Sequence, residues 1–467
     1  MQFPFGKAPL AIVILAIVSG ALVFTGATAQ HSRRPDLILA TFSKEHGAAY
    51  APAVRAFEKE HNVTIQIQVV SQRALQSRLQ AALQAGADVP DMVELLYGTM
   101  GFFTRGPLDD VQFVDLTDRV LHAGLDRSLV TSRFGLWSSR NRLFALPHDV
   151  HPVMLAYRRD LVEQLGIDVK KLTTWEEFCR VGREVVTKDL NGDGVNDRYM
   201  LDMPADGSDT LRLLLLQRGG AVFDESGDVA FDDERAVDVV CWYVKQLQGK
   251  DRIVFPCGWG QTFSRALIDG LCLFYICPDW RTSQIEADIP SLKGKLDVMP
   301  LPAWEEGGPR TSVWGGTGLA ITKGCARPDL AWKLAMHLYY DRSQLGERFA
   351  HTNILPPLKD AWTEPAFTEP RPFWSGNQIG KTYAQLAGQT PNEQVSPYQT
   401  MAVSKLSEAF TNASLFHAEH GEAGLPEFTR AELKRCADRV REVMRRNTFL
   451  NEDDKAVSAA VAEGRVE

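Results

Sequence analysis

The chain of 467 residues has no excess of positive charge: 51 Lys and Arg stand against 59 Asp and Glu, a formal net charge of -8. Nucleic acids are bound through clustered Lys and Arg, so this balance argues against nucleic acid as a partner. Common catalytic signatures are missing too, since no GxSxG, HExxH or Walker loop occurs. We therefore expect a protein that is not an enzyme.

Cysteine is scarce as well, with seven residues and no CxxC spacing. An odd number leaves at least one thiol unpaired, and a chain of this size does not need disulfides for stability. Cys257, Cys272 and Cys277 lie close in sequence, and one pair among them could oxidise after export. Cys272 and Cys277 flank "LFYI", which is typical of a buried strand, so small buried side chains are the favoured interpretation.

Long apolar runs are absent except near the N-terminus, where Lys7 precedes a run that ends in Ala27-Thr28-Ala29. This pattern predicts that residues 1–29 are a cleaved signal peptide. The alternative is an uncleaved membrane anchor, because about 20 apolar residues span a bilayer. No Cys lies nearby to carry a lipid. We expect an exported, periplasmic or extracellular protein that meets the membrane only through this segment.

Secondary-structure patterns indicate an α/β fold. Residues 35–42 and 90–96 form short apolar runs, and 63–70 alternate like a strand. The segments between them have helical periodicity, and the second helix is predicted to end at Gly86. Strands separated by helices favour parallel βαβ units, whose ligands bind beyond the carboxyl ends of the strands.

The stretch "KDLNGDGVNDRY" (188–199) repeats oxygen-bearing side chains like a calcium loop. Met200 occupies the twelfth position, where a calcium sensor needs a bidentate Glu, which argues against a calcium switch. Two interpretations stay open: a solvated Asx-rich turn, or a structural Ca²⁺ held by Asp189, Asn191, Asp193 and Asp197. Just before it, Thr173 or Thr174 is predicted to cap a helix that begins "WEEF".

Several segments in this order resemble the extracellular solute-binding proteins, family 1, of ABC sugar importers, which are maltose-binding-protein-like. They are "AFEKEHNVTIQIQVV", "LPHDVHPVMLAYRRDLVEQLGID", "TTWEEF", "LIDGLCLFYICPDW" and "WGGTGLAITKGCARPDLAWKLAMHL". The resemblance implies a periplasmic-binding-protein-like fold of type II, with two discontinuous lobes joined by hinge strands. The lobes would be 36–147 plus 303–350, and 148–302 plus 351–467.

The same resemblance implies a function: a monomer that captures a mono- or oligosaccharide by hinge closure and delivers it to an ABC permease. Sugars pack their C–H faces on aromatic rings and bond polar groups through their hydroxyls. The matching positions in this sequence are Phe42, Ser43, Lys44, Glu94, Tyr97, Thr99, Asp149, His151, Asp209, Trp280, Arg281, Trp314, Gly315, Trp374 and Tyr398.

Two alternatives remain. An anchored protein of the same fold could present its sugar to a sensor rather than a permease. A secreted glycoside-acting enzyme would need two carboxylates facing across a cleft. Glu94 and Asp149 could be imagined in that role, but no spacing rule supports it.

Overall fold

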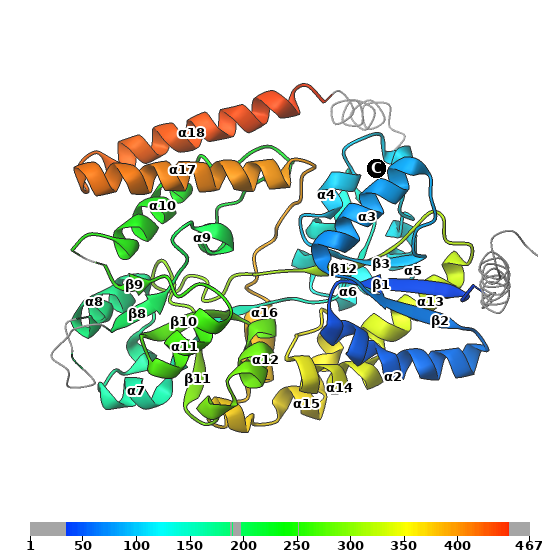
Figure 1. The fold of residues 1–467 in the computed structure, drawn as a ribbon, viewed down its shortest axis with the longest axis horizontal. Helices are drawn as coiled ribbons and strands as arrows, with labels where there is room; N and C mark the ends of the chain where they lie inside the picture. Colours follow the sequence, from blue (N-terminus) through cyan, green and yellow to red (C-terminus); the bar gives the residue numbers. More distant parts are fainter. Residues whose placement is uncertain (1–33, 187–188, 190–197, 251, 448–467) are drawn as a thin grey trace, which may run out of the picture.

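The computed structural model describes residues 34–186, 189, 198–250 and 252–447. Figure 1 shows two lobes side by side, each built around a sheet that helices cover. The predicted α/β class is confirmed. Within the described residues, every helix is too short or too polar to cross a membrane, and residues 1–29 lie outside that part of the chain.

The sheet of the first lobe has the strand order β2-β1-β3-β12-β6. Strand β1 runs parallel to β2 and β3, whereas β12 runs antiparallel to both β3 and β6. The bounds are β1 Leu37–Thr41, β2 Ile65–Val69, β3 Met92–Leu96, β6 Leu146–Pro147 and β12 Thr317–Ile321. A late strand thus completes a sheet that the start of the chain begins.

The sheet of the second lobe has the order β11-β7-β10-β8-β9. Strands β8, β9 and β10 are parallel, and β7 is antiparallel to both β10 and β11. The bounds are β7 Val153–Arg158, β8 Tyr199–Asp202, β9 Val254–Phe255, β10 Cys272–Pro278 and β11 Leu296–Pro300. A small hairpin, β4 (Ser138–Ser139) with β5 (Arg142–Leu143), stands apart from both sheets.

Helices cover both sheets (Figure 1). Around the first sheet they are α2 Lys44–His61, α3 Gln72–Ala85, α4 Met100–Phe103, α5 Thr117–His122, α6 Leu125–Ser128, α13 Pro328–Tyr340 and α14 Arg342–Thr352. The others are α7 Arg159–Gln164, α8 Trp175–Val185, α9 Ser208–Gln217, α10 Glu234–Leu247, α11 Gln261–Asp269, α12 Asp279–Asp288, α15 Pro365–Thr368, α16 Ile379–Ala387, α17 Gln399–His420 and α18 Leu425–Met444. Short 3-10 turns are η1 Leu108–Asp110, η2 Thr131–Arg133, η3 Gly135–Trp137, η4 Val169–Lys171, η5 Pro290–Leu292, η6 Lys359–Thr363 and η7 Pro372–Trp374.

Local signals set several of these ends. Helix α3 ends where Gly86 takes a left-handed conformation and donates to the carbonyls of Ala82 and Leu83. Helix α8 begins where the Thr174 hydroxyl accepts from the backbone N–H of Glu177. The predicted end at Gly86 and the predicted capping threonine are thus confirmed.

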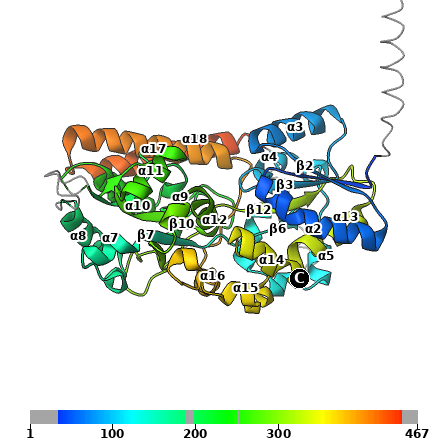
Figure 2. The same cartoon turned by 60° about the horizontal axis from the view of Figure 1, so that its bottom comes forward.

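The chain crosses from one lobe to the other in more than one segment. Residues 148–152 join β6 to β7, and residues 301–316 join β11 to β12, so each segment links one sheet to the other. A further link follows α14, which contacts α12 of the second lobe. Figure 2 shows α14, α15 and α16 along the lower edge of the molecule. The lobe boundaries proposed from the sequence stay predictions.

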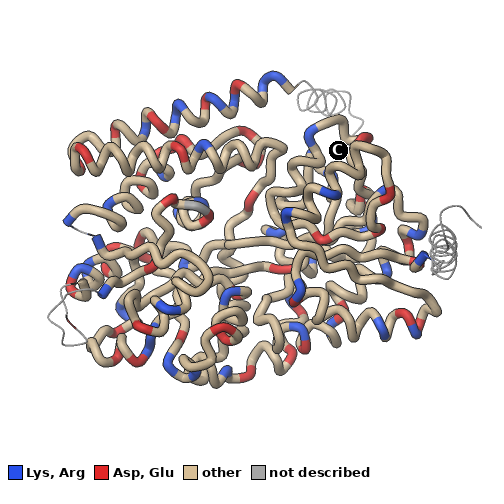
Figure 3. Tube along the Cα trace, viewed as in Figure 1, with Lys and Arg blue, Asp and Glu red and all other residues tan. Residues whose placement is uncertain are grey.

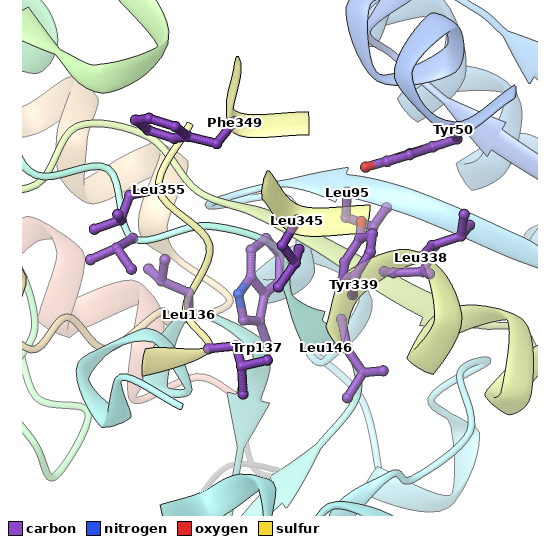
Figure 4. Packing of buried hydrophobic residues seen from close by; sticks show 14 of the residues in the cluster. Tyr50, Leu95, Leu136, Trp137, Leu146, Leu338, Tyr339, Leu345, Phe349 and Leu355 are labelled. Carbon is purple, nitrogen blue, oxygen red and sulfur yellow. The ribbon is translucent and has the colours of Figure 1, made fainter. Parts of the chain in front are cut away.

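The core of the first lobe reaches these crossing segments. Figure 4 shows Trp137 of η3 among Leu136, Leu146, Leu345 and other apolar side chains. The indole lies so close to β12 that a Cβ at Gly318 would be 2.5 Å from it. Gly318, the last glycine of "WGGTG", therefore leaves room for the buried Trp137 ring beside β12.

Charges of both signs are interspersed over the two lobes (Figure 3). On α18 they form pairs one turn apart, such as Lys434 with Asp438 and Arg439 with Glu442. Such exposed pairs add little stability, but they keep the outer face of the helix polar.

We predict that Thr174→Ala lowers the free energy of unfolding by about 1 kcal/mol, because the first turn of α8 loses its side-chain acceptor. Thr173→Ala is the matched control, since the neighbouring Thr173 side chain is exposed and does not begin the helix. Chemical denaturation measures both variants. Equal losses for the two threonines would contradict the capping assignment.

Candidate ligand-binding site

The two crossing segments 148–152 and 301–316 pair with each other. His148 donates its backbone N–H to the Thr317 carbonyl at 2.9 Å, and Val153 donates to Ser312 at 3.2 Å. Pro152 and Val313 form an antiparallel bridge between these contacts. The pairing places Asp149, His151, Trp314 and Gly315, which lie far apart in sequence, in one region between the lobes.

His151 lies between two carboxylates in this region. Its Nε2 is 3.0 Å from Asp149 Oδ2, and its Nδ1 is 2.6 Å from Asp279 Oδ1. All three side chains are buried. Burial alone would lower the pKa of His151, but the attraction of Asp149 and Asp279 outweighs it and raises that pKa to about 9. The imidazole is therefore a buried cation at neutral pH.

Arg133 of η2 fixes the backbone of both crossing segments. Its Nε donates to the Asp149 carbonyl at 3.2 Å, and its Nη2 donates to the Gly315 carbonyl at 3.0 Å. Gly315 has φ 113°, and a Cβ there would lie 2.9 Å from the His151 ring. Both its conformation and this close approach require glycine.

Three tryptophans, Trp259, Trp280 and Trp314, lie together beside the crossing segments, and we call them the aromatic wall. Trp280 donates its indole N–H to the Trp314 carbonyl at 2.9 Å, with the two rings edge to face at 5.8 Å. Trp259 lies nearly parallel to Trp280, with ring centroids 6.3 Å apart and an interplanar angle of 14°. Trp259 is 56% exposed, so part of the wall faces solvent.

Arg281 supports the aromatic wall from the buried side. Its guanidinium carbon lies 4.5 Å from the centroid of the Trp259 ring and 5.9 Å from that of Trp314. The side chain is buried and donates to the Ile276 carbonyl at 3.1 Å. Its role is cation–π support of the rings.

One hydrogen-bond chain joins the lobes next to the aromatic wall. Tyr97, just after β3, donates its hydroxyl to Asp209 Oδ1 on α9 at 2.5 Å. The Trp314 indole N–H donates to the other oxygen of Asp209 at 3.3 Å. Burial, and the carboxylate of Asp209, raise the pKa of Tyr97 far above its usual value, so the hydroxyl keeps its proton.

Buried polar atoms near Tyr97 lack partners among the described residues. The Arg212 guanidinium lies 4.6 Å over the Tyr97 ring and pairs with Glu393 through Nη1. Arg212 Nε and Nη2, Glu393 Oε2 and both amide atoms of Gln399 make no hydrogen bond within the described part of the chain. Buried polar groups in proteins nearly always have a partner, so we expect a water or a ligand to supply it here.

Other predicted residues lie at the edge of the first lobe. Ser43 caps α2, accepting from the His46 backbone N–H at 3.0 Å, and Phe42 packs partly buried beside it. The Lys44 side chain is 87% exposed and lies 3.7 Å from Glu45. Thr99 precedes α4 and is buried. The contacts found for these residues lie within the first lobe.

Glu94 lies inside the first lobe. It is 1% exposed and accepts from Tyr50 and Tyr339 on one oxygen, and from Thr41 and His46 on the other. Four donors leave its carboxylate no free position for a ligand, so the structure does not support a binding role. Glu94, His46 and His148 lie close enough together to hold a metal ion. The four hydrogen bonds already occupy the lone pairs of the Glu94 carboxylate, however.

Trp374 and Tyr398, two aromatic residues predicted to contact the ligand, are both buried. The Trp374 indole donates to Glu286 at 2.7 Å within the core, and no face of the ring is open to a ligand. Tyr398 packs beneath Arg105, whose guanidinium lies 5.3 Å from its ring centroid. The structure therefore does not support stacking on Trp374.

The predicted calcium loop lies mostly outside the described residues. Asn191, Asp193 and Asp197 are not described, and Asp189 alone is. The metal assignment stays a prediction.

Sequence reasoning missed Trp259, Asp279, Arg133, Arg212 and Glu393. Trp259 stands between two glycines in "GWG", a pattern that could have indicated an exposed ring on a turn. Asp279 precedes Trp280 in a segment that the sequence already singled out. The two arginines and Glu393 carry no local pattern, because their partners lie far away in the chain.

A family model described as bacterial extracellular solute-binding protein matches residues 43–344. The chain belongs to that family, as its resemblance predicted. The arabinooligosaccharide-binding protein of Halalkalibacterium halodurans is similar to it, with 23% identity over 82% of this chain and 86% of the relative.

Solved structures share the fold. The sugar-binding protein MalE of Xanthomonas citri has a TM-score of 0.71 at 17% identity, covering 88% of this chain and 99% of that one. The GacH receptor of Streptomyces glaucescens, solved unliganded and with acarbose, has a TM-score of 0.67 at 16% identity, covering 86% and 98%. The predicted two-lobed fold of type II is thereby confirmed.

We predict that the free energy of unfolding falls as pH rises from about 6.5 to about 10. The pKa of His151 is raised to about 9 in the folded protein, so its stabilisation is complete below the unfolded pKa of about 6.5 and is lost as pH rises through 9. The total is on the order of 3 kcal/mol. Denaturant titration across this range measures it.

The control is His151→Asn, which tolerates the left-handed backbone at this position. The variant should be less stable at pH 7, and its free energy of unfolding should lack the fall that His151 causes as pH rises. Identical slopes for the native protein and the variant would contradict a charged His151.

Proposed function

We propose that the protein captures a neutral mono- or oligosaccharide between its lobes and delivers it to an ABC permease. The observation that carries this proposal is the aromatic wall with partner-free polar atoms close by. Trp314 of the wall reaches Tyr97 through Asp209, and Tyr97 lies beneath Arg212, whose free N–H groups would meet hydroxyls. Sugars need both kinds of surface at once.

The charge balance of the site favours a neutral ligand over a phosphorylated one. The cations His151, Arg133 and Arg212 are matched by the carboxylates of Asp149, Asp279 and Glu393. A fourth cation, Arg281, lies against the aromatic wall, and a fourth carboxylate, Asp209, accepts from Tyr97 and Trp314. A phosphate would face these carboxylates, whereas hydroxyls can donate to them and accept from the arginines.

Two of the similar proteins support this ligand class. The Halalkalibacterium relative is named for arabinooligosaccharides, and GacH was solved with acarbose. Binding would close the lobes about the paired crossing segments, and the closed form would dock on the permease. We propose that the protein acts as an exported monomer and performs no chemistry on its ligand.

A thermal-shift screen over neutral sugars, with polyols and glycerol phosphates for comparison, tests the proposal. A ligand at 100 times its Kd should stabilise the folded protein by about 2.7 kcal/mol. Stabilisation by a glycerol phosphate and by no neutral sugar would overturn the ligand class. Release of a hydrolysis product from a bound glycoside would overturn the proposal that the protein only binds.

We predict that Trp280→Ala and Trp259→Ala each weaken binding of the sugar found in the screen by about 1 kcal/mol, roughly fivefold, through lost stacking. Trp259 is the sharper test, because its ring is half exposed and its removal leaves no core cavity. Trp332→Phe, on α13 under Arg119, is the control. Unchanged affinity in folded Trp259→Ala and Trp280→Ala would exclude the aromatic wall from the site.

For the loop 188–199 we propose a structural Ca²⁺ on Asp189, Asn191, Asp193 and Asp197, from the spacing of their oxygens. Calorimetric titration of the metal-free protein with calcium should show a heat of binding by millimolar concentration. Asp193→Asn should weaken calcium binding. Absence of heat at millimolar calcium would favour the solvated turn.

A further inference from the structure

We propose that Cys257 and Cys272 form a disulfide in the exported protein, and that this bond anchors the turn that carries Trp259. All seven cysteines are free thiols in the structure. The Sγ atoms of Cys257 and Cys272 lie 3.4 Å apart and both are buried. Rotation of the side chains would bring the sulfurs to the bonding distance of about 2.05 Å.

The pair closes a short loop of the second lobe. Cys272 begins β10, and Cys257 follows β9 by two residues. Both sulfurs face the Phe255 carbonyl, at 3.8 and 3.9 Å. Cys257 also donates its backbone N–H to Asp202 Oδ1 at 2.8 Å, which holds its main chain at the end of β8. The sheet thus holds Cys257 and Cys272 next to each other before any bond forms.

Cys277, the third nearby thiol, is not a competitor. It lies five residues along β10 from Cys272, about 16 Å along a strand, and its sulfur contacts the Pro278 carbonyl at 3.7 Å. Burial raises the pKa of both Cys272 and Cys277, so position and not acidity separates them. The geometry therefore selects one pair from the three cysteines that the sequence groups together.

Cys257 is 1% exposed, so an oxidant would meet its sulfur as the glycine-flanked turn opens toward the surface. Cys257 lines a surface hollow together with Phe255, Gln261 and Arg265. The family is extracellular, and disulfides form and persist in oxidising compartments. A small disulfide or a disulfide-bearing oxidoreductase could supply the oxidation there.

The chemistry is thiol–disulfide exchange. The Cys257 thiolate attacks the disulfide of the oxidant, R–S–S–R, forming a mixed disulfide and releasing one R–S⁻. The Cys272 thiolate then attacks the Cys257 sulfur, closing the new bond and releasing the second R–S⁻. Two protons pass from the protein thiols to the released thiolates. The protein loses two electrons, and the oxidant gains them as two thiols.

The bond would act on the aromatic wall. Trp259 stands between Gly258 at φ 71° and Gly260 at φ 68°, so its own backbone does little to fix the ring. The turn is fixed at Cys257, two residues before Trp259. Closing the 257–272 loop removes chain entropy from the unfolded and locally opened states, so the turn opens less often and the ring stays parallel to Trp280. This consequence rests on the proposed function, whereas the bond itself does not.

The full chain is treated with oxidised glutathione or with dithiothreitol, and its thiols are titrated after unfolding. We expect seven free thiols in the reduced sample, as the sequence holds seven, and two fewer after oxidation. Peptide mapping should find Cys257 joined to Cys272. The oxidised protein should melt on the order of 5 °C higher.

Variants separate the alternatives. Cys277→Ser, the matched control on the same strand, should still lose two thiols on oxidation, whereas Cys257→Ser and Cys272→Ser should lose none. Amide hydrogen exchange of segment 256–262 should be about tenfold slower in the oxidised native protein. An unchanged thiol count, a stable glutathione adduct on Cys257, or a bond from Cys272 to Cys277 would each overturn the proposal. None of these outcomes depends on which sugar binds.

Discussion

The protonated His151 between two buried carboxylates is the interaction on which the centre of the molecule depends. Asp149 also accepts the backbone N–H of Thr317, and Asp279 accepts that of Leu355. One charge cluster therefore holds all three links between the lobes. Each buried charge would be strongly unfavourable alone, so the cluster is stable only when every partner is in place. It thereby positions Trp314 and Trp280 for the site.

Features set by neighbours in sequence were predictable. The end of α3 at Gly86 and the Thr174 cap of α8 are determined within one helical turn. The family resemblance added the two-lobed fold, and it singled out Asp149, His151, Trp280 and Trp314, which the structure brings together between the lobes. Strand and helix order needs little beyond periodicity and turn chemistry.

Features set by distant partners were not predictable. Glu94 looks like a cleft residue at a strand, yet Tyr50 and Tyr339 reach it from two helices and occupy it. Trp374, in a loop rich in proline, looks exposed but is fully buried. Arg212 and Glu393 are 181 residues apart, so only the packed fold reveals their pairing and their free polar atoms.

The hydrogen bond from Tyr97 to Asp209 has a thermodynamic consequence of its own, because it joins the lobes without a ligand. Any contact of this kind raises the population of closed, empty protein. The ligand then needs less of its binding energy for closure, and its apparent affinity rises. The transporter then also meets closed protein that carries no ligand. The Tyr97 contact therefore raises the affinity for the ligand and, at the same time, lowers the fraction of closed protein that is loaded.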